Sequence, residues 1–198
     1  MSSTSIASEK GALRERMLRV RAGLPPAVRE AASRAITARL AALPAWKDAR
    51  TVALHAALGA EVDTAELARL ALAEGKRIAW PRTAPSGPGL TFASCPAAEL
   101  VPGPARALEP PADAPPVHLS SIDLLVVPGV AFDTRGGRLG RGRGHYDAAL
   151  SRIRPVAIRV GLCFDEQVVE RVPVEPHDVR VDLVVTPTGV LAAGDGPG

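Results

Sequence analysis

The residues best suited to chemistry lie in the segment 135–147, where glycine and arginine alternate. Every second position from 140 to 144 is glycine, which lets backbone amides approach a ligand closely because it has no Cβ. Three arginines lie among these glycines: Arg138, Arg141 and Arg143. Asp147 follows, where we expect a helix to begin. Convergent amides, guanidinium groups and a helix N-terminus are suited to binding a polyphosphate.

The spacing of this segment differs from that of two common nucleotide-binding motifs. It lacks the lysine-serine or lysine-threonine pair of a Walker loop and the G-x-G-x-x-G spacing of a dinucleotide fingerprint. Composition alone is equally compatible with a flexible basic loop. However, the apolar run 124–127, bounded by Pro128-Gly129, is typical of a strand buried on both faces. A buried strand before the loop and a carboxylate after it favour a nucleotide site.

Helices and strands are predicted to alternate along the rest of the chain. Apolar spacing and terminal signals indicate helices over 8–23, 25–43 and 63–75. Further strands are expected over 51–55, 77–80, 156–162 and 182–187, with a short one at 90–92. This alternation predicts an α/β fold whose sheet is largely parallel, with helices on both faces.

Length and composition suit one domain that acts on a small anionic molecule. The chain has 198 residues, of which 46% are hydrophobic, and a net charge of +3. We expect a single domain over 1–198, with loose ends at 1–7 and 189–198 and a long loop region at 84–119. No lysine-rich run or aromatic interleaving favours nucleic acid. Cys95 and Cys163 form no metal pattern, and no stretch is typical of a membrane span or signal peptide, so a cytoplasmic protein is expected.

Two stretches resemble the signature of the 5-formyltetrahydrofolate cyclo-ligase (5,10-methenyltetrahydrofolate synthetase) family. They are Pro-Gly-Val-Ala-Phe-Asp at 128–133 and Gly-Arg-Leu-Gly-Arg-Gly-Arg-Gly-His-Tyr-Asp at 137–147. The resemblance extends from Lys10 to Thr186. It implies a three-layer α/β/α sandwich and the conversion of 5-formyltetrahydrofolate and ATP, with Mg²⁺, to 5,10-methenyltetrahydrofolate, ADP and phosphate. It also implies small-molecule partners only, with no nucleic acid or membrane, and a monomer or weak dimer.

The resemblance assigns roles to individual residues. Lys10 and Arg14 share one helix face at i and i+4, and in the family such a pair contacts the phosphates of ATP. The other ATP-binding positions that it implies are Arg138, Leu139, Gly140, Arg141, Gly142, Arg143, Gly144, His145 and Tyr146. The folate-binding positions are Ala56, Glu61, Arg141, Gly142, Arg143, Gly144 and His145. Arg138, Arg143 and Tyr146 are the catalytic positions, and Asp147 and Asp182 are the metal ligands.

Several of these residues also have a simpler interpretation from the sequence alone. Lys10 with Arg14 could form a solvated basic face, and Glu61 could be an ordinary loop residue. Asp147 could serve only as a favourable charge at a helix N-terminus, and Asp182 could be a solvated residue at a strand end. Arg82, just after a predicted strand, is either a surface residue or a contact for an anionic substrate.

Three positions have no settled role. His145 stands where the family most often has the first of two tyrosines, and a histidine titrates near neutral pH. His177 and Asp178 match a family segment without an assigned function. Two other functions stay open: an arginine-glycine RNA-binding module over 135–143, whose affinity would fall steeply with salt, and a catalytically silent folate-binding regulator.

Overall fold

A mixed eight-stranded sheet forms the centre of the protein. The computed structural model describes residues 3–84, 89–104, 107–142 and 144–194. Within these ranges the strand order is β12-β11-β10-β7-β1-β2-β3-β6. The strands are β1 (Thr51–Ala53), β2 (Arg77–Thr83), β3 (Leu90–Ala93), β6 (Pro116–Val117), β7 (Leu124–Val127), β10 (Ile158–Leu162), β11 (Leu183–Val185) and β12 (Val190–Ala192). Two small antiparallel pairs lie outside it: β4 (Val101–Pro102) with β5 (Leu108–Glu109), and β8 (Ala131–Phe132) with β9 (Arg138–Leu139).

The central strands are parallel, as the sequence predicted. β11, β10, β7, β1 and β2 run in one direction. β12 pairs with β11, β3 with β2 and β6 with β3, all antiparallel. The predicted long loop region 84–119 therefore contributes two strands to the sheet, β3 and the edge strand β6, because Leu90, Phe92 and Val117 are buried in the sheet's core.

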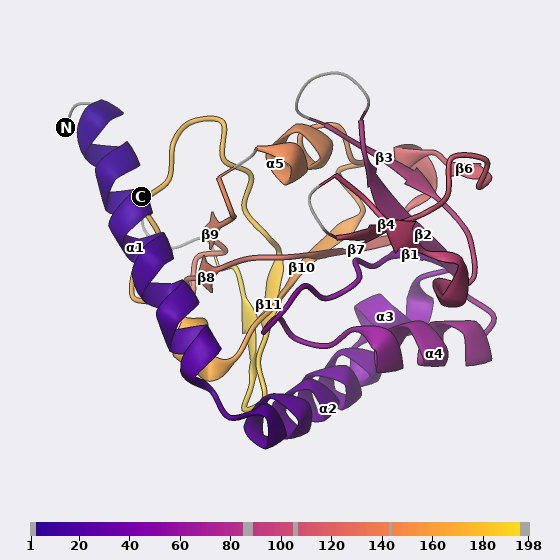
Figure 1. The fold of residues 1–198 in the computed structure, drawn as a ribbon, viewed down its shortest axis with the longest axis horizontal. Coiled ribbons are helices and arrows are strands. Elements are labelled where there is room, and N and C mark those ends of the chain that lie inside the picture. The colour runs from indigo at the N-terminus through magenta and orange to yellow at the C-terminus, as the bar shows by residue number, and fades with distance from the viewer. Residues whose placement is uncertain (1–2, 85–88, 105–106, 143, 195–198) are drawn as a thin grey trace.

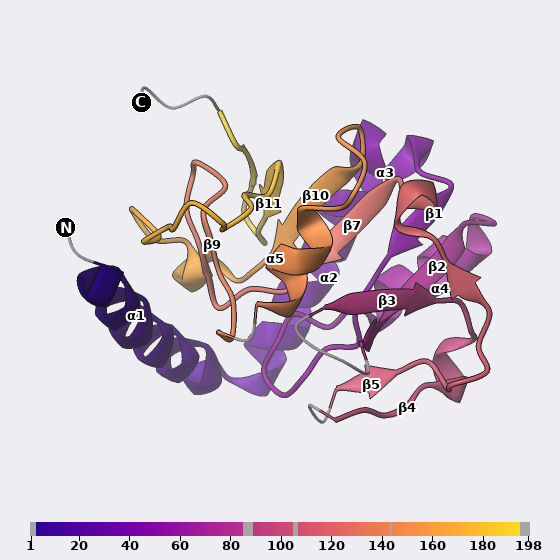
Figure 2. The same ribbon diagram turned by 90° about the horizontal axis from the view of Figure 1, so that it is seen from above.

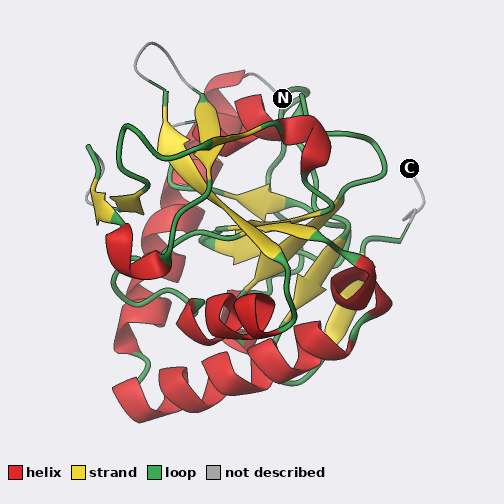
Figure 3. Ribbon diagram, turned by 90° about the vertical axis from the view of Figure 1, so that its right-hand side faces the viewer, coloured by secondary structure: helices red, strands yellow, loops and turns green. Residues whose placement is uncertain are grey.

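Helices cover both faces of the sheet (Figures 1 and 3). On one face lie α2 (Pro26–Ala42), α3 (Pro44–Asp48) and α4 (Ala65–Ala73). Ile36, Trp46 and Leu67 from these helices share a buried cluster with Val52 and Val126 of the sheet. On the other face α5 (His145–Leu150) packs through Leu150 into a second cluster. The predicted three-layer α/β/α sandwich is confirmed.

The long helix α1 (Ser3–Gly23) lies beside the sheet next to the β8–β9 pair (Figure 2). Its Met17 packs with Val130, Leu139 and Val172 in a third buried cluster. α1 begins at Ser3, so residues 3–7 of the stretch expected to be loose are helical. At the other end, β12 occupies part of the expected loose tail because its backbone pairs with β11. None of the described helices is both long and apolar enough to cross a membrane.

The strand order creates a crevice beside β1. The chain passes from β1 through α4 to β2 on one side, and from β7 through α5 to β10 on the other. β1 and β7 are neighbours, so the connections diverge between them. Ligands of open α/β sheets bind beyond the carboxyl ends of the strands at such a point. His55 and Ala56 follow β1 at this edge, and Pro128 and Gly129 follow β7.

Candidate active site

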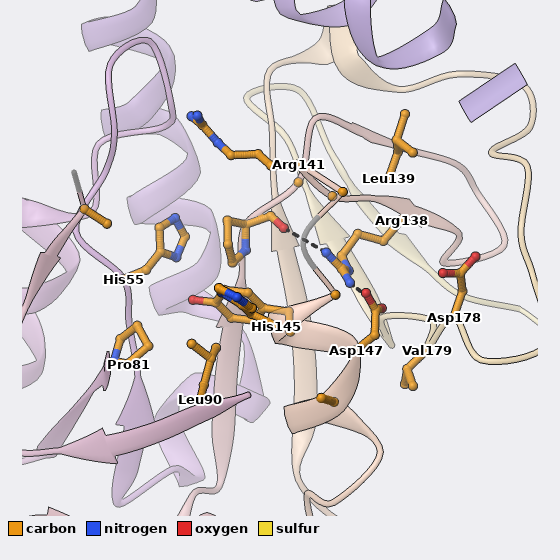
Figure 4. A pocket seen from close by; sticks show the side chains of 18 of the residues that line it. His55, Pro81, Leu90, Arg138, Leu139, Arg141, His145, Asp147, Asp178 and Val179 are labelled. Atoms are coloured by element: carbon orange, nitrogen blue, oxygen red, sulfur yellow. Dashed lines mark hydrogen bonds and ion pairs between the residues drawn. The ribbon is translucent and has the colours of Figure 1, made fainter. Parts of the chain in front are cut away.

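A cavity of about 1240 Å³ lies at this edge of the sheet. Its wall combines α1, the segment after β1, the end of β2, the loop 138–147 and the segment 175–179 (Figure 4). Most of the residues that the sequence predicted for the site line it: Lys10, Arg14, Ala56, Glu61, Arg138, Leu139, Gly140, Arg141, Gly142, Gly144, His145, Tyr146 and Asp147. Arg143, predicted to be catalytic and to bind both substrates, lies outside the described residues.

Backbone geometry explains the glycines of the loop. Gly142 has φ +87° and Gly144 has φ +68°, a conformation that residues with a Cβ rarely adopt. Gly144 is also the N-cap residue of α5. The Nε of Arg14 donates to the carbonyl of Gly140 at 2.9 Å. Arg14 therefore ties α1 to the loop, which brings the two predicted phosphate-binding segments together.

Arg138 and Asp147 form an ion pair in the cavity wall (Figure 4). Nη2 of Arg138 donates to Oδ1 of Asp147 at 2.5 Å, and Nη1 donates to the Pro128 carbonyl at 3.3 Å. Only 3% of the Arg138 side chain is exposed, against 22% for Asp147. Among the described residues, Nε of Arg138 is buried without a hydrogen-bond partner. A buried guanidinium in the wall of a cavity is suited to binding an anion.

Lys10 lies between two carboxylates at the α1 end of the cavity. Its Nζ is 2.7 Å from Oε2 of Glu175 and 2.5 Å from Oδ2 of Asp178. Burial by itself lowers the pKa of Lys10. The hydrogen bonds to Asp178 and Glu175 outweigh this effect, so the pKa of Lys10 lies above its ordinary value. Burial opposes ionisation of Asp178, yet Lys10 and the Glu175 amide hold its pKa below the ordinary value. Lys10 and Asp178 are therefore both charged at neutral pH.

Glu61 is the carboxylate of the opposite end. Its side chain is 9% exposed, and Oε1 accepts from Nη2 of Arg141 at 2.7 Å. Oε2 accepts from the Leu58 amide at 2.9 Å, and Nε2 of His55 lies 3.9 Å away. Burial opposes ionisation of Glu61, but His55, the Leu58 amide and Arg141 together lower its pKa. Glu61 is thus an ionised carboxylate inside the cavity rather than a solvated loop residue.

The wall between these two ends is mainly apolar. Pro81 and Leu90 lie near His55 and His145 (Figure 4). Tyr146 lines the cavity beside them, and its burial, with the charge of Glu61, raises its pKa. Its hydroxyl therefore stays protonated at neutral pH and is able to donate a hydrogen bond to a ligand. Arg82 points elsewhere, since it donates to the carbonyls of Pro110 and Pro111 and does not line the cavity.

The predicted metal ligand Asp182 lies away from this cavity, and we correct its assignment. It precedes β11, so it lies at the amino edge of the parallel sheet. Its Oδ2 accepts from Nε of Arg159 at 2.9 Å and from the Arg159 backbone at 2.7 Å. The cavity lies beyond the carboxyl edge. Asp182 therefore supports the start of β11 instead of meeting Asp147.

The structure adds residues that sequence reasoning had left without a role. Asp178, Glu175 and His177 line the cavity, and their candidate ligand atoms lie within 4.8 Å of one another. His55 lines it as well. Asp178 could have been found from its place in a segment that matches the family. His55 carried no signal beyond its position at the end of a predicted strand.

Comparison with known proteins agrees with this geometry. A sequence model of the 5-formyltetrahydrofolate cyclo-ligase family matches residues 6–187. A 5-formyltetrahydrofolate cyclo-ligase of Escherichia coli K12 is 38% identical over 176 residues, which cover 87% of this chain and 96% of the relative. One from Mycolicibacterium smegmatis is 31% identical over 190 residues, covering 92% and 96%. The solved Aquifex aeolicus 5,10-methenyltetrahydrofolate synthetase superimposes with a TM-score of 0.82 at 33% identity, covering 96% of this chain and 95% of that one.

The fold, the cavity and these relatives together define an α/β/α enzyme of the ligase class. More particularly, the chain belongs to the 5-formyltetrahydrofolate cyclo-ligase family, whose signature covers nearly its whole length.

Proposed function

We propose that this protein converts 5-formyltetrahydrofolate and ATP to 5,10-methenyltetrahydrofolate, ADP and phosphate in a magnesium-dependent reaction. The observation that carries the proposal is one continuous cavity with two chemically different ends. One end gathers Lys10, Arg14 and Arg138 around the glycine-rich loop, and the other holds the ionised Glu61. Such a cavity suits a polyphosphate and a second substrate that reacts with it.

The reaction needs a better leaving group on the formyl carbon. The formyl oxygen attacks the γ-phosphorus of ATP. An O–P bond forms, the bond from the γ-phosphorus to the bridging oxygen of ADP breaks, and ADP leaves, giving an iminophosphate. The N10 amine then attacks the activated carbon, the C–O bond breaks, and phosphate leaves with the original formyl oxygen. N10 loses its proton as the ring closes. The protein must mainly orient the reactants and stabilise the charge on the transferred phosphoryl group.

The basic end of the cavity can stabilise that charge. Arg138 is buried and held by Asp147, so its guanidinium is fixed before the substrates bind. Arg14 is fixed in the same way by its bond to the Gly140 carbonyl. Donors that are already oriented stabilise a transition state more effectively than donors that must reorganise. Arg138 is therefore the residue we assign to phosphoryl transfer, with Lys10 and Arg14 as phosphate ligands.

The other end suits the pterin part of the folate. A 2-amino-4-oxopteridine presents an N–H and an NH₂ donor side by side, and a carboxylate such as Glu61 accepts both. Apolar residues, Pro81 and Leu90 among them, line the wall between the ends. Tyr146 and His145 lie on this wall as well and can stack on the ring or donate to its oxygen.

The residues present are compatible with magnesium, which would supply positive charge to the phosphates. Mg²⁺ prefers carboxylate and phosphate oxygens and uses few protein ligands. Asp147 and Asp178 both line the cavity near the basic loop and are the candidates for holding it. Arg138 and Lys10 neutralise these carboxylates in the structure. Asp178→Asn should therefore raise the magnesium concentration needed for half-maximal rate, while Asp182→Asn should leave it unchanged.

The decisive experiment follows the absorbance of methenyltetrahydrofolate with purified protein and 5-formyltetrahydrofolate. We expect product only when ATP and magnesium are both present. Product without ATP would contradict the mechanism. Binding of 5-formyltetrahydrofolate without turnover under any condition would identify a folate-binding regulator. RNA binding that falls steeply with salt, without turnover, would favour the arginine-glycine module, although Arg138 and Arg141 both pair with carboxylates of the cavity wall.

A further inference from the structure

Arg21 is the third cation on the cavity side of α1. Lys10, Arg14 and Arg21 are spaced by four and seven residues, so they follow one stripe of the helix. Lys10 and Arg14 line the basic end of the main cavity. Arg21 lies in the last turn of α1 and is buried. Its burial sets it apart from the other two and calls for a partner of opposite charge.

That partner is Glu61. Nη2 of Arg21 lies 3.8 Å from Oε1 of Glu61, and both side chains are less than 10% exposed. Nη1 of Arg21 donates to the Gly129 carbonyl at 3.3 Å, which anchors the guanidinium to the segment after β7. Arg21, His55 and Glu61 also share the wall of a small cavity of about 10 Å³, and His55 and Glu61 line the main cavity as well. Charges in such a place are screened little by solvent.

Three groups could neutralise Glu61, and they differ in how constantly each keeps a positive charge beside it. Arg141 is 47% exposed and precedes Gly142, in the loop assigned to the phosphates, so an anionic ligand can draw it away. Burial lowers the pKa of His55 in spite of the neighbouring Glu61, so its ring is not a permanent cation near neutral pH. Burial also lowers the pKa of Arg21, while Glu61 raises it and Arg141 lowers it, yet a guanidinium stays charged near neutrality. Arg21 is the permanent cation of this set.

We propose that Arg21 is a positioning residue that keeps the Glu61 carboxylate ionised and correctly oriented for the pterin. The inference rests on the proposed function and extends it to a residue that does not touch the substrate. When nucleotide phosphates attract Arg141, Glu61 keeps a counter-ion and remains a double acceptor. Without Arg21, a buried carboxylate would lose its fixed partner and favour its neutral form.

A double-mutant cycle on 5-formyltetrahydrofolate binding tests the proposal. Calorimetry should give a dissociation constant about 10-fold or more higher for Arg21→Met than for wild type, because Glu61 loses its fixed cation. ADP affinity should change less than about twofold. Arg21→Lys, which keeps the charge, should recover part of the loss. In a Glu61→Gln background, Arg21→Met should weaken folate binding by less than about twofold further, since the residue acts through Glu61.

Arg69→Met is the matched control, because it removes the same charge from an exposed pair with Glu66 outside the cavity. It should leave both affinities unchanged. Equal losses from Arg21→Met in the two backgrounds, or equal losses of folate and ADP affinity, would show a merely structural role and overturn the inference. If Arg21→Met does not fold, the same cycle with Arg21→Lys decides. If the wild type turns over but the effects of Arg21→Met and Glu61→Gln on folate affinity are additive, only this inference is rejected. If the wild type does not turn over, the proposed function is rejected.

Discussion

Two aspartate–arginine pairs lie at opposite edges of the same sheet. Asp147 pairs with Arg138 at 2.5 Å, and Asp182 pairs with Arg159 at 2.9 Å. The first pair faces the cavity beyond the carboxyl ends of the strands, and its arginine is 3% exposed. The second lies at the amino edge, where its residues are 35% and 23% exposed and tie β10 to β11.

The comparison shows that the edge, and not the pair, decides the role. At the amino edge the carboxylate is fully engaged by its own neighbours, since Asp182 accepts from the Arg159 backbone as well as its side chain. Asp123 does the same with the amides of Arg50 and Thr51. At the carboxyl edge, Asp147 faces open space that a ligand can fill. The pairs at the amino edge therefore serve stability, whereas the Asp147–Arg138 pair at the carboxyl edge is available for chemistry.

The largest expected effect is on Asp147. Asp147→Asn keeps the size but removes the charge that would balance Arg138 and help to hold magnesium. We expect kcat to fall about 100-fold or more, with part of the rate recovered at high magnesium. Steady-state kinetics over a magnesium series measures both. Unchanged activity at limiting magnesium would show that Asp147, like Asp182, takes no part in catalysis or magnesium binding.

A smaller loss is expected when the glycine geometry of the loop is disturbed. Gly142→Ala and Gly75→Ala both place a Cβ at positive φ, +87° and +71°, so each should cost about 1–2 kcal/mol of stability. Only Gly142 lies in the cavity. Gly142→Ala should therefore lower kcat/KM roughly 10-fold through misplaced phosphate ligands, while Gly75→Ala leaves it intact. Equal activities in the two variants would argue against the loop as nucleotide site.

The third prediction concerns Asp182, for which we expect a loss of stability without a loss of activity. Asp182→Asn should lower the free energy of unfolding by about 1 kcal/mol, because a partly exposed ion pair contributes little more than that. Its kcat and magnesium requirement should equal those of wild type. Denaturant unfolding and the same magnesium series provide the comparison. A large rise in magnesium requirement would restore Asp182 to the metal site and refute our correction.

The smallest expected effect is a dependence of stability on pH at the amino edge. Burial opposes ionisation of Asp123, but the amides of Thr51 and Arg50 and the Arg154 side chain lower its pKa below 3.8. A lowered pKa means that the unfolded chain takes up the proton first, so the stabilisation is present above pH 3.8 and fades as pH falls through the folded value.

Asp123→Asn should therefore lower the melting temperature by about 1–2 °C at neutral pH. The difference from wild type should shrink as the pH is lowered through this range. A difference that is constant with pH would show that the charge of Asp123 contributes nothing to stability.

Much of the fold was predictable because its signals are local. The apolar run of β7 was predicted at its observed limits. The strands β2 and β11 were predicted to within a few residues of their observed ends. The alternation of strands and helices was sufficient for a largely parallel sheet. The short strand β3 was predicted to within one residue. α3 and the edge strand β6 were missed, because their residues are set by packing against the sheet rather than by periodicity.

The sequence by itself determined the family, the parallel α/β architecture, the glycine-arginine loop and the pairing of Lys10 with Arg14 on one helix face. These depend on residue type and short spacing. Tertiary structure alone decided which carboxylates meet. Asp178 contacts Lys10 across 168 positions, and Arg141 contacts Glu61 across 80. Strand direction placed Asp182 at the far edge of the sheet, four residues from Asp178 in sequence. An irregular segment such as 172–182 has no period from which its direction could be inferred, so only the folded chain distinguishes the two aspartates.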